Sequence, residues 1–210
     1  MIGNAGVILA GGKSRRMGEN KAELLFKGEP LLARVARRVA PVVDELLIIG
    51  PESLTALIPW ARVVSDLVPE VGPLGGLYTA LRATSSARVF LLACDMPFVR
   101  PRLVRAMLQL AVSDEEAEAV VLRAGTRLHP LHSVYSAGCL PVVEQAIASG
   151  DYSMHALLAR ITVVTVSSET VSREDPDGIS PFNVNTAADW ERALRLADEL
   201  DVPDAASDGR

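Results

Sequence analysis

Residues 5–21 read AGVILAGGKSRRMGENK, an apolar run that gives way to glycines and cations. The run Ala5–Ala10 is nearly continuous in its hydrophobicity, as is typical of a strand buried on both faces of a parallel sheet. Glycines after such a strand let backbone N–H groups approach a phosphate closely, and cations neutralise its charge. The loop holds four cations against one carboxylate, namely Lys13, Arg15, Arg16 and Lys21 against Glu19. It therefore predicts a polyphosphate-binding loop, with a solvated, flexible loop as the alternative.

Two better-known phosphate-binding loops are excluded. The substring Gly12-Lys13-Ser14 matches the end of a Walker A loop, but that loop requires glycine where Val7 stands. The dinucleotide fingerprint GxGxxG is also absent after this strand. A phosphate site here would be of another kind.

Outward from this segment, strand-like and helix-like patterns alternate. Further strands are predicted at residues 46–49, 62–64, 89–93, 119–122 and 161–166, and an antiparallel strand at 132–135. Helices are predicted after Pro30, after the Gly/Pro-rich turn GPLGG at 72–76, after Pro101 and after Thr186. In the first of these helices, Arg34, Arg37 and Arg38 are expected on the polar face. The alternation predicts an α/β fold with a mainly parallel, partly mixed sheet covered by helices.

Length and composition are those of an ordinary globular protein. With 210 residues, 49% apolar and 22% charged, the chain favours one large domain over residues 1–200. Residues 201–210 are expected to form a disordered acidic tail. A net charge of −5 excludes binding of nucleic acid through bulk positive charge, and no run approaches the roughly 18 apolar residues of a membrane helix. Two cysteines without CxxC spacing and no signal peptide favour the cytoplasm.

Carboxylates follow two of the predicted strands. Asp95 lies in Cys94-Asp95-Met96-Pro97 after the strand at 89–93, and Asp66 follows the strand at 62–64. Because carboxyl ends of parallel strands share one edge of a sheet, both residues are expected at the same edge. From its position, Asp95 is either a Mg²⁺ ligand or an Asx-type cap of the turn before Pro97.

The segment Asn183-Val184-Asn185-Thr186 precedes the last predicted helix. Asparagine both donates and accepts, which suits a substrate contact or a helix entry, and Thr186 with Asp189 fits a helix N-cap. His129 and His132, in LHPLH, lack a third ligand at useful spacing, which argues against a zinc site.

These motifs, in this order, resemble one family. The pattern LAGG-x-S-x-RMG-x-x-K, followed by GPLGG, CDMP and NVNT, is similar to the molybdenum cofactor guanylyltransferases and spans residues 9–186. The resemblance implies a Rossmann-like three-layer αβα sandwich of the nucleotidyltransferase type. It also implies a nucleotide-binding half at about residues 1–100 and an acceptor-binding half at about 101–200.

The resemblance also implies roles for individual residues. Lys21, Asp95 and Arg16 would be catalytic, and Asp95 would hold Mg²⁺, the expected cofactor. The residues implied to bind GTP are Leu9, Ala10, Gly11, Gly12, Lys21, Asp66 and Asp95. Acceptor-side candidates are Arg127, His129, Asn183 and Asn185. The chain departs from the family pattern at Gly50, where relatives often carry asparagine, and near Tyr152, where they often carry arginine.

The implied reaction is attack by the terminal phosphate of molybdenum-bound molybdopterin on the α-phosphorus of GTP, with pyrophosphate leaving. Two anions must approach in line, so the site needs charge neutralisation more than a general base. Cytidylyl transfer to the same acceptor, sugar-phosphate nucleotidyl transfer and a non-catalytic nucleotide sensor are the alternatives. Other cofactor-biosynthesis proteins are implied as partners, nucleic acid and membrane are not expected, and a monomer or weak homo-oligomer is expected.

Overall fold

The computed structural model describes residues 3–11 and 21–200, so Gly12, Arg16 and the expected acidic tail lie outside the described residues. Its centre is a seven-stranded sheet with the order β5-β4-β1-β6-β8-β7-β9. The strands are β1 (Asn4–Leu9), β4 (Glu45–Ile49), β5 (Arg62–Val64), β6 (Arg88–Ala93), β7 (Ala119–Ala124), β8 (Arg127–Ser136) and β9 (Val163–Thr165). A separate two-stranded ribbon consists of β2 (Leu25–Phe26) and β3 (Glu29–Pro30).

The direction of the strands confirms the predicted mixed sheet. β1 pairs in parallel with β4 and β6, β4 with β5, and β7 with β9. β8 is antiparallel to both of its neighbours, β6 and β7. The antiparallel strand expected at residues 132–135 is therefore present, but it is longer and begins at Arg127.

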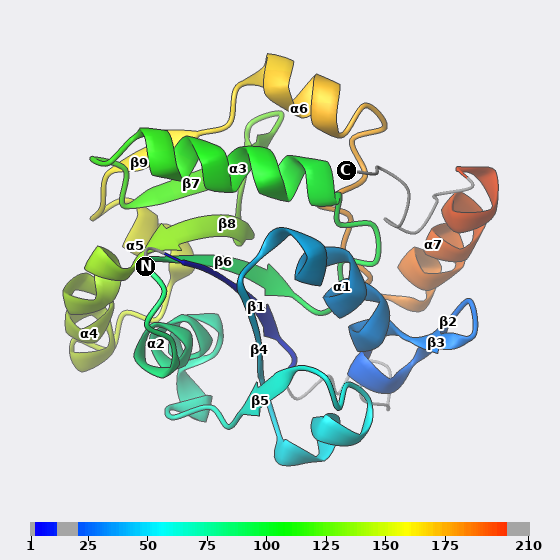
Figure 1. Cartoon of the computed structure of the whole chain (residues 1–210), viewed down its shortest axis with the longest axis horizontal. Coiled ribbons are helices and arrows are strands. Elements are labelled where there is room, and N and C mark those ends of the chain that lie inside the picture. Colours follow the sequence, from blue (N-terminus) through cyan, green and yellow to red (C-terminus); the bar gives the residue numbers. More distant parts are fainter. Residues whose placement is uncertain (1–2, 12–20, 201–210) are drawn as a thin grey trace.

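Helices cover both faces of the sheet, as the three-layer expectation requires (Figure 1). On one face, α1 (Leu31–Val39) and α3 (Pro101–Ser113) bury leucine, valine and methionine against Ile8, Ile48 and Phe90. On the other, α2 (Pro73–Ala83), α4 (Leu140–Ala148) and α5 (Met154–Leu158) pack on Val7, Leu47 and Leu91. The alternation of side chains along each strand supplies both faces. None of the described helices is long and apolar enough to cross a membrane.

Two further helices and several single turns complete the described chain. They are α6 (Ser168–Glu174), α7 (Ala187–Glu199) and the 3-10 segments Lys21–Glu23, Ala40–Val42, Glu52–Ala56, Pro69–Val71 and Ala137–Cys139. α7 lies beside the β2–β3 ribbon, away from the central sheet (Figure 1). Between these elements is a third apolar cluster formed by Phe26, Leu31, Phe98, Ile179, Val184 and Ala193.

The polar face expected on α1 is wrong in part. Arg34 and Arg38 are only 7% and 2% exposed, whereas Arg37 faces solvent. Arg34 Nε donates to the carbonyl of Pro97 at 3.1 Å, and Arg38 Nε donates to that of Val99 at 2.8 Å. Their burial is tolerated because backbone carbonyls accept hydrogen bonds from the two guanidinium groups. The two arginines thus fix the loop that follows Asp95.

The GPLGG segment is the start of a helix instead of a turn. Gly72 is the N-cap of α2 with φ 71°, and Pro73 is its first helical residue, a position where proline costs no hydrogen bond. A Cβ on Gly75 would lie 2.6 Å from the carbonyl oxygen of Val68. Glycine is needed here because the helix start lies directly against the loop after β5.

This close approach predicts the effect of Gly75→Ala. The added methyl meets backbone, which cannot move aside as a side chain can, so the free energy of unfolding should fall by about 1–3 kcal/mol. Urea denaturation measures this change. Gly138→Ala is the control, since a Cβ there meets only Ser136 Oγ at an ordinary 3.4 Å. Equal stability of the two variants would contradict the packing described.

Candidate functional site

The carboxyl ends of β1, β4 and β6 remain hydrogen-bonded to one another beyond the last strand residues. Cys94 N–H donates to the carbonyl of Leu9 at 3.1 Å, and Ala10 N–H donates to that of Ile49 at 2.9 Å. Leu9 itself pairs with Ala93 across the β1–β6 ladder. Leu9, Ala10, Gly11 and Asp95 consequently leave the sheet at one edge and at one level.

Lys21, Asp95 and Asn185 meet at this edge. Lys21 Nζ lies 3.1 Å from Asp95 Oδ2 and 3.0 Å from Asn185 Oδ1. The Lys21 and Asp95 side chains are each 15% exposed. We call these three side chains the Lys21 cluster. They come from the start of the chain, from the tip of β6 and from the entry to α7, so only the fold brings them together.

The carboxylate of Asp95 does not cap its own turn through any hydrogen bond of the described residues. Its Oδ2 accepts from Lys21, while Oδ1 is buried and has no hydrogen-bond partner among the described residues. Its backbone carbonyl accepts from Val184 N–H at 2.9 Å. An Asx cap would require a backbone N–H on the carboxylate, and within the described chain Asp95 has none.

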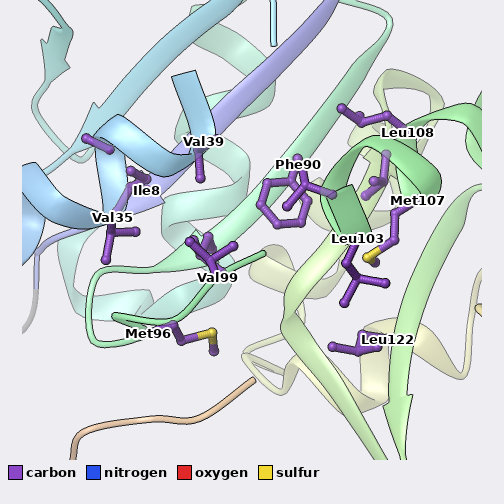
Figure 2. Close-up of a cluster of buried hydrophobic side chains, with 14 of the residues drawn as sticks. Ile8, Val35, Val39, Phe90, Met96, Val99, Leu103, Met107, Leu108 and Leu122 are labelled. Carbon is purple, nitrogen blue, oxygen red and sulfur yellow. The ribbon is translucent and has the colours of Figure 1, made fainter. Parts of the chain in front are cut away.

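The loop behind Asp95 is anchored in the core. Met96 and Val99 are fully buried, and Figure 2 shows them in the same apolar cluster as Ile8, Val35 and Phe90. With the carbonyls of this loop held by α1, the tip of β6 cannot swing freely. Asp95 is therefore presented from a rigid support.

The third apolar cluster explains how Lys21 and Asn185 come within reach of each other. Phe26, shortly after Lys21, packs edge-to-face on Phe98 and on Trp190 of α7, with ring centroids 5.9 and 5.6 Å apart. Such aromatic pairs prefer this geometry. Packing of the β2–β3 ribbon against α7 thereby places residue 21 opposite residue 185.

The NVNT segment serves as a helix entry and as a site element at once. Thr186 and Asp189 form the predicted capping box, and the carboxylate of Asp189 also accepts from Asn185 N–H at 3.0 Å. With its backbone held in this way, the Asn185 side chain is directed to Lys21. The Oδ1 atom of neighbouring Asn183 is buried and lacks a partner within the described residues.

Asp66 lies at the same edge of the sheet, but its hydrogen bonds hold the local structure together. Its Oδ1 accepts from Val68 N–H at 3.0 Å and from Thr79 Oγ1 at 2.9 Å. These bonds tie the loop after β5 to α2. The carboxylate is not hydrogen-bonded to the Lys21 cluster.

Arg127 and His129 lie where β8 begins, which is the same edge because β8 is antiparallel to β6. Arg127 is exposed, and His129 is partly buried. Burial and the charge of Arg127 lower the pKa of His129, which favours its neutral form. Neither side chain is hydrogen-bonded to the Lys21 cluster, so the structure places them on the rim without joining them to it.

One of the two departures from the family pattern, Gly50, has a local explanation. A Cβ on Gly50 would lie 2.8 Å from Leu54 Cδ1 and 3.3 Å from the backbone of Ala10, which leaves little room for a side chain. Tyr152 is 46% exposed. Burial raises the pKa of Cys94 to about 12, which keeps it a thiol and argues against a role as a nucleophile.

His132 is a buried histidine whose structural role the sequence analysis did not predict. His132 is fully buried, packs edge-to-face on Phe90, and its Nε2 lies 2.8 Å from Ser180 Oγ. Its Nδ1 has no partner among the described residues, so the imidazolium, which needs two acceptors, is disfavoured. Burial lowers the pKa of His132 to about 3. The sequence signal for the burial of His132 was the alternation of side chains in LHPLHSVY, which is typical of a strand.

This low pKa predicts acid sensitivity of the fold. Between about pH 3 and the ordinary histidine value of about 6.5, the unfolded chain binds up to one proton more than the folded chain at His132. The contribution to the free energy of unfolding is therefore present above pH 6.5 and decreases as the pH falls, by about 2–3 kcal/mol at pH 4.5. Urea denaturation at several pH values measures this change. In His132→Gln, the free energy of unfolding should fall less steeply as the pH drops below about 6.5, because the titrating imidazole is absent.

The matched control is His155→Gln, at an exposed position, which should keep the wild-type slope. An identical pH dependence in wild type and His132→Gln would contradict the neutral, buried state of His132.

Comparisons with known proteins show which family the chain belongs to. The model of the MobA-like NTP transferase domain matches residues 6–166. A relative from Pelotomaculum thermopropionicum, named "Probable molybdenum cofactor guanylyltransferase", is 36% identical over 94% of this chain and 95% of its own length. One from Pseudomonas putida, named molybdenum cofactor guanylyltransferase, is 40% identical over 75% of this chain and 83% of its own.

The crystal structure of molybdopterin-guanine dinucleotide biosynthesis protein A from Archaeoglobus fulgidus is similar throughout. It superposes with a TM-score of 0.81 at 26% identity, covering 93% of this chain and 99% of that one. These matches confirm the resemblance noted in the sequence and the α/β fold inferred from it. The chain belongs to the MobA-like NTP transferases, a family of nucleotidyltransferases.

Proposed function

We propose that the protein transfers GMP from GTP to molybdenum-bound molybdopterin, forming the guanine dinucleotide cofactor and pyrophosphate. The observation that carries the proposal is the Lys21 cluster, a partly buried cation, carboxylate and amide at the carboxyl edge of β1 and β6. The names of the relatives from Pelotomaculum thermopropionicum and Pseudomonas putida support the guanylyl branch.

Lys21 is suited to bind the triphosphate. An ammonium group has three N–H donors, and two of them point to Asp95 and Asn185. The third can donate to a phosphate oxygen, and low exposure of the group strengthens that contact relative to water. In this proposal Lys21 and Arg16 neutralise the two anions that must approach each other, while backbone groups of Leu9, Ala10, Gly11 and Gly12 line the phosphates.

Asp95 fits as a ligand of Mg²⁺. The buried, unpartnered Oδ1 is an oxygen donor of the type that this ion prefers. Within the described residues no group of three or more His, Cys, Asp or Glu could hold a metal. A single carboxylate completed by phosphate oxygens and water is the usual arrangement for Mg²⁺ at a nucleotide. When bound, the ion would neutralise charge on the phosphates and on the leaving pyrophosphate.

The remaining candidates divide between the two substrates. Asp66 is proposed to act on the guanosine side, with its loop position fixed by Val68 and Thr79. Asn183, Asn185, Arg127 and His129 are proposed on the acceptor side. Asn185 reaches Lys21, so the proposed nucleotide-binding and acceptor-binding halves of residues 1–200 meet at the Lys21 cluster.

The proposal predicts a loss of transfer in two variants. Lys21→Ala removes the cation and Asp95→Asn the metal-binding charge, and each should lower the rate of pyrophosphate release from GTP and molybdopterin by on the order of 10²–10³-fold. The same assay with CTP, ATP and UTP, and with sugar phosphates as acceptors, measures base and acceptor preference.

Two matched variants serve as controls. Arg82→Ala and Asp151→Asn alter exposed ion pairs with Glu144 and Arg160, away from the Lys21 cluster, and should retain full activity. Near-normal activity of both site variants would contradict the assignment of the site. Faster transfer from CTP or to a sugar phosphate would replace the proposed substrate, and nucleotide binding without pyrophosphate release would indicate a sensor.

A further inference from the structure

Beneath the NVNT segment lies a buried polar group that the mechanism does not use. Its members are Arg100, His132, Asp175 and Ser180, and the last three are 0–2% exposed. Polar side chains buried to this degree cost stability unless their hydrogen bonds are made. Their contacts therefore show what the group holds in place.

The hydroxyl of Ser180 joins three parts of the chain. Ser180 Oγ accepts from Arg100 N–H at 3.0 Å, at the N-cap of α3, and lies 2.8 Å from His132 Nε2 on β8. Ser180 itself belongs to the loop between α6 and α7. One oxygen atom thus fixes this loop to the loop that follows Asp95 and to the sheet.

Asp175 shapes the same loop from within. Its Oδ2 accepts from Ser180 N–H at 2.9 Å, its Oδ1 accepts from Ile179 N–H at 3.3 Å, and Arg100 Nε lies 3.5 Å from Oδ1. Burial raises the pKa of Asp175, while the two backbone donors and Arg100 act in the opposite direction. Among the described residues, two backbone N–H groups and Arg100 thus offset the cost of burying this carboxylate.

The loop is attached to the segment 95–100 at two points. One is the Ser180–Arg100 bond, and the other is the bond from Val184 N–H to the carbonyl of Asp95. Between them, Phe182 N–H donates to the carbonyl of Ile179, which closes a turn. Asn183 and Asn185 flank the second attachment, and Asn185 contacts Lys21, so a shift of this loop would move the Asn185 side chain relative to Lys21.

We propose that Ser180 is a positioning residue, which with Arg100, His132 and Asp175 holds the Asn183–Asn185 segment in register with Asp95. It touches neither substrate and acts through Asn185. The inference rests on the proposed function only for its catalytic consequence, because the register itself is a property of the protein without ligands.

Amide hydrogen exchange of the ligand-free protein tests the register directly. Ser180→Ala leaves Arg100 N–H and the His132 ring without their partner, so exchange at the Val184 amide should accelerate by on the order of tenfold or more. Exchange at the Cys94 amide, which donates to Leu9 within the sheet, should stay unchanged. The matched control is Ser133→Ala, an equally buried serine whose hydroxyl donates to the carbonyl of His129. It should leave Val184 unaffected.

Kinetics then separate positioning from general destabilisation. Ser180→Ala should lower kcat/KM by on the order of tenfold in the wild-type background and much less in an Asn185→Ala background, because residues that act through one another are not additive. Should Ser180→Ala fail to fold, His132→Phe removes one of its contacts while keeping a ring against Phe90, and should accelerate Val184 exchange in the same direction.

The outcomes are distinguishable. Unchanged Val184 exchange in a folded Ser180→Ala or His132→Phe protein overturns the positioning role, whatever the activity. Additive losses in Ser180→Ala and Asn185→Ala overturn its action through Asn185. If Ser180→Ala accelerates Val184 exchange but the wild-type protein transfers no nucleotide, the positioning role is supported and only the proposed function is rejected.

Discussion

The parallel register of β1 with β6 is the constraint on which the site depends. Leu9 lies opposite Ala93, so the loop beginning at Ala10 and the turn at Asp95 leave the sheet side by side. A slip of one residue would turn every side chain of β1 to the opposite face. Both faces of β1 are buried, by α1 and α3 on one side and α2 on the other, and this double burial fixes the register.

The rest of the site is assembled onto this edge by segments distant in sequence. Lys21 is brought in by the β2–β3 ribbon, and Asn185 by the entry to α7, with one aromatic cluster between the two elements. The loop behind Asp95 is held by Arg34 and Arg38 from one side and by Ser180 from another. Charge neutralisation at fixed positions suits the proposed transfer between two phosphates.

Much of this arrangement follows from local sequence patterns. The apolar run before Gly11 predicts β1, the N-cap pattern at Thr186 predicts the start of α7, and alternation of strands and helices predicts the parallel sheet. The edge shared by Asp95 and the glycine-rich loop follows from the sheet alone. Family resemblance added the pairing of Lys21 and Asp95 in one site, and the structure places their side chains 3.1 Å apart.

Other features depend on tertiary contacts that no local pattern contains. Arg34 and Arg38 look like a solvated face of α1 until the carbonyls of residues 97 and 99 are seen beside them. The glycines of GPLGG suggest a turn, but Gly75 is required by the close approach of Val68 to a helix. The group around Ser180 joins residues 100, 132 and 175, which are too far apart in sequence to form a motif.

In the proposed function, Lys21 and Asp95 together bind a triphosphate and its magnesium. Titration calorimetry of GTP against the wild-type protein and the Asp95→Asn variant, each with and without Mg²⁺, tests it most directly. We expect Mg²⁺ to strengthen GTP binding to the wild type and to have little effect on the variant. Equal affinities with and without the ion in the wild type, or an undiminished effect of the ion in Asp95→Asn, would contradict the account.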